Sequence, residues 1–429
     1  MTLGNIVGVI RNGIARYSHI NWTLLDQALV SGVNFFTSIL LARYLGLQGF
    51  GVFTLVWMAV LFVNSLQFAL VSSPMMSIGP LQPENESSVY YGSVLIQQVI
   101  VSSISFLLLL VGFWASGYYF SEWEVGGLAW PSACACFSFQ MQDYLRRYFF
   151  TRGRITTVFI SDLLSYGGQL LLLLLMFYSG LTTITNALWV IAITSFLAML
   201  WGLLKLERHL YPSMSYFASN LKRHWKSSRW LAASALLDWT SGNLFFIAAG
   251  AILGAWATGT LRAALNLIGP VSLIFQTLLN LMPGSAARKY RSEGMNGLVA
   301  YIKKCAFGVT AVSVLYFLPI IVAPEFWLTL LYGGAYTENY SLVFWFCLAY
   351  TALASRVPIE IGLRTLERTK YSFWALTAST IFAIGTHNYL ITRYGISGAG
   401  FGVLMSMLIA LSVCFFGFRK EIMAAGLKI

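Results

Sequence analysis

The sequence contains few charges and little polar surface for contact with water. Asp, Glu, Lys and Arg make up 10% of the 429 residues, whereas 58% of the chain is hydrophobic. The mean hydropathy is +0.72. Such a composition excludes a soluble globular domain. A net charge of +12 would suggest nucleic acid as the partner of a soluble protein. Here we expect no such partner, because basic residues also mark membrane topology and attract membrane lipid headgroups.

Motifs for catalysis and for binding metals or cofactors are missing as well. The sequence has no Gly-rich phosphate loop of the Walker type, no His-Glu-x-x-His and no Gly-x-Ser-x-Gly. No loop is large enough to carry a glycosyl-transfer site. Five cysteines lie in or beside apolar segments without metal-ligand partners, and we interpret them as small core residues: Cys134, Cys136, Cys305, Cys347 and Cys414. We therefore expect no enzymatic activity, no cofactor and no bound metal.

What the sequence has is a dozen apolar runs, each about long enough to cross a bilayer. An even number of crossings puts both termini on one side of the membrane. The runs cover residues 24–45, 50–73, 92–115, 127–149, 156–178, 184–204, 230–253, 257–281, 304–323, 341–362, 371–391 and 396–418.

The basic residues fix the direction of these crossings. Of the 27 Lys and Arg residues, 23 lie at the termini or in alternate gaps between the runs. Basic loops stay in the cytoplasm, so both termini are expected there. The sequence thus predicts an all-α, multi-pass protein of the cell inner (plasma) membrane with twelve transmembrane helices.

Two short patterns recur in the second half of the chain. Gly46 and Gly51 follow the first run, and Gly254 and Gly259 follow the seventh, 208 positions later. The stretch Thr151–Arg154 is matched by Glu367–Lys370 at an offset of 216. Repeats of this order predict two pseudo-symmetric lobes of six helices each, as in two-lobed transporters.

The predicted organisation has three parts. Residues 1–204 form an N-lobe that begins with an interfacial helix. Residues 205–229 form a basic cytoplasmic linker, and residues 230–429 form a C-lobe. The linker carries apolar residues at helical spacing, which indicates a helix lying at the membrane interface.

Some ionisable residues fall inside the apolar runs, where each costs roughly 2.5–3.5 kcal/mol on insertion scales. Such residues usually face a partner or a polar cavity. Asp26, Asp238 and Glu360 are candidates for carrying a coupling ion, either H⁺ or Na⁺. Arg356 and Glu360 are four residues apart, so a helix would let them form an ion pair. A structural pair and a ligand contact by Arg356 are both open.

Polar residues also fall on single faces of the predicted helices. Gln27 and Asn34 share a stripe on the first, and Arg262 and Asn266 share one on the eighth. Polar stripes should face the protein interior, so we predict that these residues line a substrate cavity. Gln67 in the second helix joins them as a candidate, although such amides more often join helices.

Arg262 carries the most specific of these predictions. It has no acidic residue within a turn on its own helix. A cation without a partner that faces an interior cavity suits an anionic substrate, especially a phosphate. The alternative is a structural salt bridge to Asp238 or Asp26.

Two stretches of the sequence resemble a known family. Leu40–Phe53, LLARYLGLQGFGVF, is similar to the segment after the first helix of polysaccharide-biosynthesis flippases. These flippases belong to the multidrug, oligosaccharidyl-lipid and polysaccharide exporter (MOP) superfamily. The stretches Asn280–Gly294 and Tyr301–Lys304 resemble the family's loop between helices eight and nine.

The resemblance implies a function. It implies flipping of a polyprenyl-diphosphate-linked oligosaccharide to the outer leaflet, for O-antigen, capsule or exopolysaccharide assembly. It also implies alternating access of two lobes, coupling to an ion gradient, and a cationic cavity for the diphosphate, a role that Arg262 fits. Membrane lipids, a polysaccharide polymerase and chain-length proteins are the implied partners.

Two other functions compete with the flippase. In a cation-coupled exporter of drug-like molecules with the same fold, Asp26 and Asp238 would carry the ion and Arg262 would be structural. A membrane-embedded polymerase or ligase is disfavoured by the small outer loops.

Overall fold

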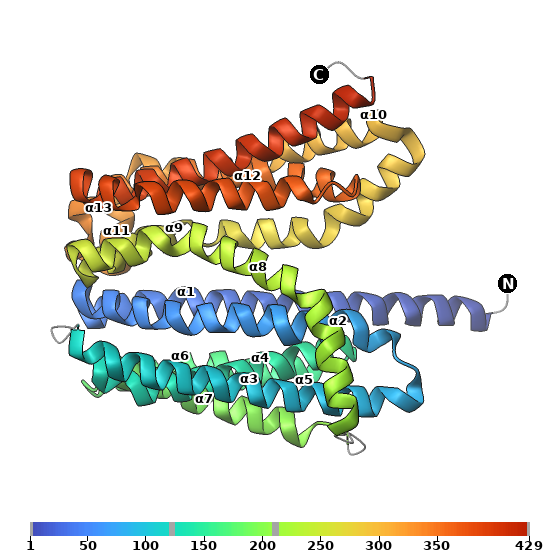
Figure 1. Cartoon of the computed structure of the whole chain (residues 1–429), viewed down its shortest axis with the longest axis horizontal. Helices are drawn as coiled ribbons and strands as arrows, with labels where there is room; N and C mark the ends of the chain where they lie inside the picture. Colours follow the sequence, from blue (N-terminus) through green and yellow to red (C-terminus); the bar gives the residue numbers. More distant parts are fainter. Residues whose placement is uncertain (1–2, 120–124, 208–213, 427–429) are drawn as a thin grey trace. The chain divides into compact units, whose positions relative to one another are not determined.

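The computed structural model describes residues 3–119, 125–207 and 214–426, and within these ranges the chain is helical and has no strands (Figure 1). The α-helices are α1 (Leu3–Gln67), α2 (Ser73–Ile78), α3 (Glu84–Tyr119), α4 (Ala129–Thr151), α5 (Ile155–Asp162), α6 (Gly168–Tyr178), α7 (Ile184–Leu204), α8 (Met214–Leu253), α9 (Ala255–Ile268), α10 (Val271–Val322), α11 (Pro324–Tyr332), α12 (Ser341–Thr365) and α13 (Lys370–Ala424). Two π-helices, η1 (Phe68–Ser72) and η5 (Leu163–Gly167), continue α1 and α5.

Several long helices contain more than one membrane crossing, because the chain turns at a glycine. Gly46 in α1 has φ 67°, Gly294 in α10 has φ 65°, and Gly395 in α13 has φ 60°. Gly254, with φ 102°, separates α8 from α9. A side chain disfavours this left-handed backbone region, so glycine is the residue that permits each turn.

These turns give twelve crossings. Eight stretches of the described residues are long and apolar enough to span a membrane. Two of them, Leu25–Leu81 and Lys370–Ala424, are divided by Gly46 and Gly395 into two crossings each. The remaining two are α4 and the run from α9 to Gly294. The predicted all-α fold with twelve membrane helices in two pseudo-symmetric lobes is confirmed.

The chain divides into two compact units, and each unit is built from two separate stretches of the sequence. Unit 1 comprises residues 1–40 and 56–232, and unit 2 comprises residues 41–55 and 233–429. The segment 41–55 is fixed within unit 2 by hydrogen bonds: Arg43 Nε donates to the carbonyl of Leu331 (2.6 Å), and the Tyr336 hydroxyl donates to that of Ala42 (2.9 Å).

The predicted domain boundaries stay a prediction. Within the predicted linker, residues 208–213 lie outside the described residues, and residues 214–229 form the start of α8. The predicted interfacial helix at the N-terminus is helical from Leu3 and continues into the first crossing.

The repeat at offset 208 has a physical explanation in unit 2. A Cβ on Gly51 would lie 1.8 Å from the carbonyl oxygen of Ala255, and one on Gly259 would lie 2.6 Å from that of Leu47. Ala255 is itself the counterpart of Leu47, so the two junctions contact each other reciprocally. Both positions require glycine because no side chain fits between the backbones.

The second repeat joins the fourth and fifth crossings of each half. Gly153 and Glu367 adopt positive φ at the α4–α5 and α12–α13 turns. In the same turns the backbone N–H of Arg154 donates to Phe149, and that of Arg368 to Leu363. The structure therefore aligns Arg154 with Arg368 at an offset of 214, two positions from the sequence match.

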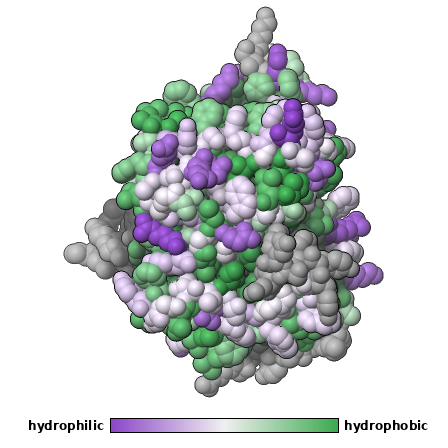
Figure 2. All heavy atoms as spheres, turned by 90° about the vertical axis from the view of Figure 1, so that its left-hand side faces the viewer, coloured by the Kyte–Doolittle hydropathy of each residue, from purple (hydrophilic) through white to green (hydrophobic). Residues whose placement is uncertain are grey.

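Exposed apolar side chains cover the lipid-facing side of the helices. On α3 they include Ile104, Leu107, Leu108, Val111 and Trp114. At the helix ends that Figure 2 faces, hydrophilic and hydrophobic residues are mixed, as expected where helices leave the bilayer.

Candidate functional site

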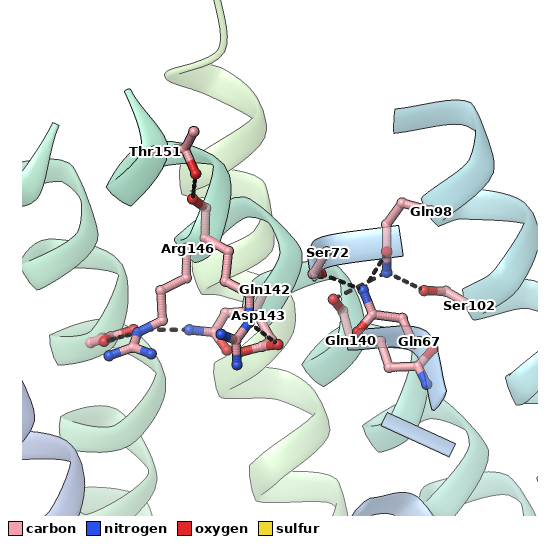
Figure 3. Close-up of polar contacts among 11 residues, drawn as sticks. Gln67, Ser72, Gln98, Ser102, Gln140, Gln142, Asp143, Arg146 and Thr151 are labelled. Carbon is pink, nitrogen blue, oxygen red and sulfur yellow. Dashed lines mark hydrogen bonds and ion pairs between the residues drawn. The ribbon is translucent and has the colours of Figure 1, made fainter. Parts of the chain in front are cut away.

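A buried cluster of three charged side chains lies in unit 1. Arg146 on α4 donates from Nη2 to Asp26 Oδ2 on α1 (2.7 Å) and from Nε to Asp162 Oδ2 at the end of α5. Both carboxyl side chains are fully buried, and the guanidinium side chain is 12% exposed. Gln142, one turn before Arg146, donates to Asp162 Oδ1 (3.0 Å; Figure 3). The cluster ties three crossings together.

The charges in this cluster do not balance. It holds two carboxyl groups and one guanidinium, and the carboxyl groups of Asp26 and Asp162 lie close together because both bond to Arg146. Among the described residues, no donor reaches Asp26 Oδ1. Two buried carboxyl groups in contact are stable when they share a proton or a cation lies between them. The cluster is therefore one positive charge short of neutrality when both carboxyl groups are ionised.

The role of Arg146 is not visible in the sequence, because its acidic partners are 120 and 16 positions away. The neighbouring Asp143 and Arg147, four residues apart, form a separate ion pair of 2.8 Å. Gln142 lies four residues before Arg146 on the same helix face, and this spacing could have indicated that Arg146 belongs to a polar face of the helix.

Unit 2 contains a related cluster. Arg356 and Glu360 on α12 form the ion pair that their spacing predicted, with an N–O distance of 3.5 Å and 12% exposure of each side chain. Asp238 on α8 lies within electrostatic range of both, and Cys414 Sγ lies 3.7 Å from Glu360 Oε1. Again two carboxyl groups accompany one guanidinium.

The two clusters occupy comparable places in the repeat. Asp26 and Asp238 come from the first crossing of each half, at an offset of 212. Arg146 corresponds at offset 214 to Glu360, and Gln142 to Arg356. The fourth crossing thus supplies the arginine in both units, one helical turn apart.

Arg262 has no acidic partner in the part of the chain that the structure describes. It lies on α9 in unit 2, partly buried, within electrostatic range of Tyr332 and Tyr350. Asn266, one turn further on, lies near the hydroxyl of Tyr332. Asp238 is near Arg356 rather than Arg262. The described residues thus contain no structural salt bridge for Arg262.

The remaining predicted cavity residues lie in unit 1 and differ in their surroundings. Asn34 is exposed and Gln27 is partly buried on α1. Gln67 is fully buried, and its amide donates to Ser72 Oγ (2.8 Å) and Gln98 Oε1 (2.5 Å). The structure does not bring Gln67 into contact with Gln27 or Asn34 by any hydrogen bond among the described residues.

The Gln67 amide belongs to a polar network between helices. Gln98 on α3 donates to Ser102 and to the backbone carbonyl of Gln140 (Figure 3). Gln140 in turn donates to Ser105. This pattern is that of an amide joining helices. Its role in substrate contact stays a prediction.

Two of the buried polar residues, Gln67 and Asp162, are each followed directly by a π-helix. Gln67 is followed by η1 (Phe68–Ser72), and Asp162 by η5 (Leu163–Gly167). A π-helix shifts the helix face by one residue and is frequent at functional sites. Sequence patterns contained no signal for either π-helix.

Comparison with known proteins places the fold. No protein-family profile matches the sequence, and no curated protein matches it. Solved structures do match. An inward-facing multidrug-resistance MATE family transporter of the MOP superfamily is 15% identical with TM-score 0.72, covering 93% of this chain and 95% of its own. The lipid II flippase MurJ, in an inward closed conformation, is 12% identical with TM-score 0.70, covering 93% and 87%.

A third structure agrees. A MOP superfamily transporter from Pyrococcus furiosus is 14% identical with TM-score 0.62, covering 95% of each chain. At these identities the likeness concerns the fold. The chain is therefore a multi-pass helical membrane protein. Its fold is the one shared by MATE transporters and the MurJ flippase.

Proposed function

We propose that the chain is a MOP-superfamily transporter that flips a polyprenyl-diphosphate-linked oligosaccharide from the cytoplasmic to the outer leaflet. The single observation that carries the proposal is Arg262, a membrane-embedded cation without an acidic partner among the described residues. The resemblance of Leu40–Phe53 to polysaccharide-biosynthesis flippases and the fold shared with the lipid II flippase MurJ support it.

The chemistry of Arg262 fits a diphosphate. A guanidinium presents a fork of N–H donors that matches phosphate oxygens, and its charge is permanent. An arginine within the membrane is costly without a partner, so an anionic substrate would relieve that cost. Asn266, Gln27, Asn34, Gln67 and Arg356 are the proposed polar contacts for the diphosphate and the sugars. Proposed protein partners are a polysaccharide polymerase and chain-length proteins.

The two charge clusters are the proposed sites of ion coupling. Each contains two carboxyl groups and one guanidinium, so each can take up one H⁺ or one Na⁺. Occupancy would change the net charge of a buried site by one unit. A change of this size is large enough to bias alternating access of the two lobes.

The test uses Arg262 variants in a strain that lacks the native flippase. Arg262→Ala should abolish surface polysaccharide, because the diphosphate loses its cation. Arg262→Lys should retain part of the activity, because the charge remains but the fork is lost. Arg393→Ala is a matched control: Arg393 is an exposed arginine of unit 2, and polymer should be normal. Unchanged polymer with Arg262→Ala at normal protein level would refute the proposed substrate contact.

A second candidate is a cation-coupled exporter of small amphipathic molecules. The structural likeness to a multidrug-resistance MATE transporter and the Asp26 cluster favour it. The two functions are separated in vesicles loaded with either a labelled lipid-linked glycan or a fluorescent cationic dye. Movement of the dye alone, abolished by Asp26→Asn and unaffected by Arg262→Ala, would assign the exporter.

A further inference from the structure

A group of basic residues gathers at one end of unit 1, away from the sites described above. Arg152 and Arg154 lie in the turn between α4 and α5, and Lys205 caps the C-terminus of α7. Arg154 Nη1 donates to the backbone carbonyl of Lys205 (2.8 Å), which joins the two segments. We call these three residues and Glu207 the basic turn.

Aromatic rings hold each cation in place. The guanidinium of Arg152 lies 5.7 Å from the ring centre of Tyr91, and that of Arg154 lies 5.3 Å from Phe149. The ammonium of Lys205 lies 4.5 Å from the ring centre of Trp201. Cations fixed on rings lose less conformational freedom on binding an anion than mobile surface lysines do.

The basic turn has more donors than its own acceptors use. Glu207 accepts two hydrogen bonds from Arg152, of 3.1 and 2.8 Å. Among the described residues, Lys205 has no acidic partner, and Arg154 forms no ion pair. The Tyr148 hydroxyl, 1% exposed, lies in electrostatic range of both arginines and has no hydrogen-bond partner among the described residues. Three cations and one acid leave an excess of two positive charges.

The surface beside the basic turn is suited to binding a lipid. The outer face of α7 that leads to Lys205 is apolar and exposed, with 44% exposure of Phe196, 49% of Leu197 and 81% of Leu204. An acyl chain can lie along this face while its headgroup reaches the cations. A free phosphate or a soluble protein would gain nothing from that apolar surface.

The equivalent turn of unit 2 lacks part of this arrangement. At offset 214, Leu366 stands in place of Arg152, whereas Arg368 corresponds to Arg154 and Glu421 to Glu207. There Arg368 is itself bonded to Glu421, at 3.2 Å. The turn of unit 2 thus lacks the counterpart of Arg152, and Arg419 stands at the place of Lys205.

We propose that the basic turn binds the phosphate of an anionic phospholipid in the membrane leaflet at this end of the helices. The proposal does not rest on the transported substrate. Arg154 and Lys205 would contact the phosphate, and the lipid chains would pack on α7. Bound in this way, the lipid would join α7 to the α4–α5 turn, within the helices that carry the Asp26–Arg146–Asp162 cluster.

Native mass spectrometry of the purified full-length protein tests this site. Phosphatidylglycerol and phosphatidylcholine are added separately, and the affinity for the tightest bound lipid is measured. Phosphatidylglycerol should bind more tightly than phosphatidylcholine. The double variant Arg154→Gln/Lys205→Gln should weaken phosphatidylglycerol binding by roughly tenfold or more, because it removes two cations that attract the anionic headgroup. This variant leaves the Arg152–Glu207 pair intact.

The matched control is Lys303→Gln/Lys304→Gln, which removes two exposed cations from unit 2 and should leave the tightest binding unchanged. Lys205→Gln alone gives a milder variant if the double variant unfolds, and should weaken binding several-fold. An equal loss in the control would mean unspecific surface attraction and overturn the proposal. Displacement by millimolar inorganic phosphate, or preferential binding of a polyprenyl diphosphate at the same residues, would overturn the assignment to a phospholipid.

Discussion

At the scale of single residues, the side chains that matter most are charges inside the membrane. Their pairing follows a simple physical rule, because a buried charge is tolerated when an opposite charge or several hydrogen bonds neutralise it. The Arg356–Glu360 pair could be predicted because both residues lie on one helix, four positions apart. The pairing of Arg146 with Asp26 could not be, because it depends on how three separate helices pack.

The first prediction concerns Arg146. Arg146→Met should lower the free energy of unfolding by about 3–5 kcal/mol, because it leaves two buried carboxyl groups without their cation. Thermal unfolding of the detergent-purified protein measures the change. Arg152→Gln removes a more exposed arginine and should cost less than about 1 kcal/mol.

Neutralising the acids should restore stability to the Arg146 variant. Asp26→Asn and Asp162→Asn added to Arg146→Met should recover most of the loss, because no charge then remains in the cluster. A triple variant as unstable as the single one would show that Arg146 acts through packing rather than through charge.

At the scale of helices, the positions of certain glycines and of one histidine explain how neighbouring helices pack against each other. The reciprocal contact of Gly51 and Gly259 brings two helix starts closer than any side chain would allow. The repeated glycines are visible in the sequence, but a pattern of glycines does not say which backbone each one faces. The π-helices after Gln67 and Asp162 are likewise decided by tertiary packing, since isolated sequences do not favour them.

Gly51→Ala should destabilise the protein by roughly 1–3 kcal/mol, because the added Cβ collides with the Ala255 carbonyl and the backbones must separate. Gly112→Ala is the control, since a Cβ there meets no atom within 4 Å. Its melting temperature should stay equal or rise slightly because alanine favours a helix. A melting temperature of Gly51→Ala equal to wild type would contradict the tight contact.

The first part of α8 is attached to unit 1 by a polar face. Asn220, His224 and Ser228, spaced four apart, are buried. His224 Nε2 shares a hydrogen bond of 2.9 Å with the Tyr90 hydroxyl. Leu221 and Trp225 are 50% and 59% exposed. The apolar face of this part of α8 is thus exposed, while its polar face is buried against protein.

This attachment should depend on pH. Burial, with help from Arg223, lowers the pKa of His224 from 6.5 to about 4. A lowered folded-state pKa means that the neutral imidazole is preferred, so its stabilisation is complete above about pH 6.5 and is lost as the pH falls toward 4. Going from pH 7.5 to 5 should weaken the attachment by roughly 2 kcal/mol.

Hydrogen exchange of residues 216–226, corrected for the intrinsic effect of pH, measures the attachment. His224→Gln serves as the control, because glutamine can bond to Tyr90 but does not titrate in this range. Equal pH dependence in wild type and the His224→Gln variant would assign the effect to another group.

At the scale of the whole molecule, the number and direction of the crossings decide every later conclusion. The fold was accessible from the sequence because the bilayer is a uniform solvent, so apolar length and the position of basic loops are enough to count helices. The predicted N-lobe, residues 1–204, included residues 41–55, which the structure places in unit 2. Local composition does not encode this assignment.

Topology can be checked by labelling single cysteines from either side of the membrane with an impermeant maleimide. Ser215→Cys and Met295→Cys should react from the cytoplasmic side alone, and Glu338→Cys, in the exposed turn before α12, from the outer side alone. The unsubstituted protein controls for its own five cysteines. Reaction of positions 215 and 295 from opposite sides would invert part of the chain and remove the basis of the proposed function.

The amino-acid sequence by itself determined that this protein is helical, crosses the membrane twelve times and repeats in two halves, because hydrophobic length, basic loops and recurrent glycines are local properties. Only the tertiary structure decided which charges neutralise one another. It buried Arg146 between Asp26 and Asp162 and left Arg262 without an acidic partner among the described residues. Ion pairing depends on distances of a few ångströms between helices that are far apart in the chain, and these distances arise when the helices pack.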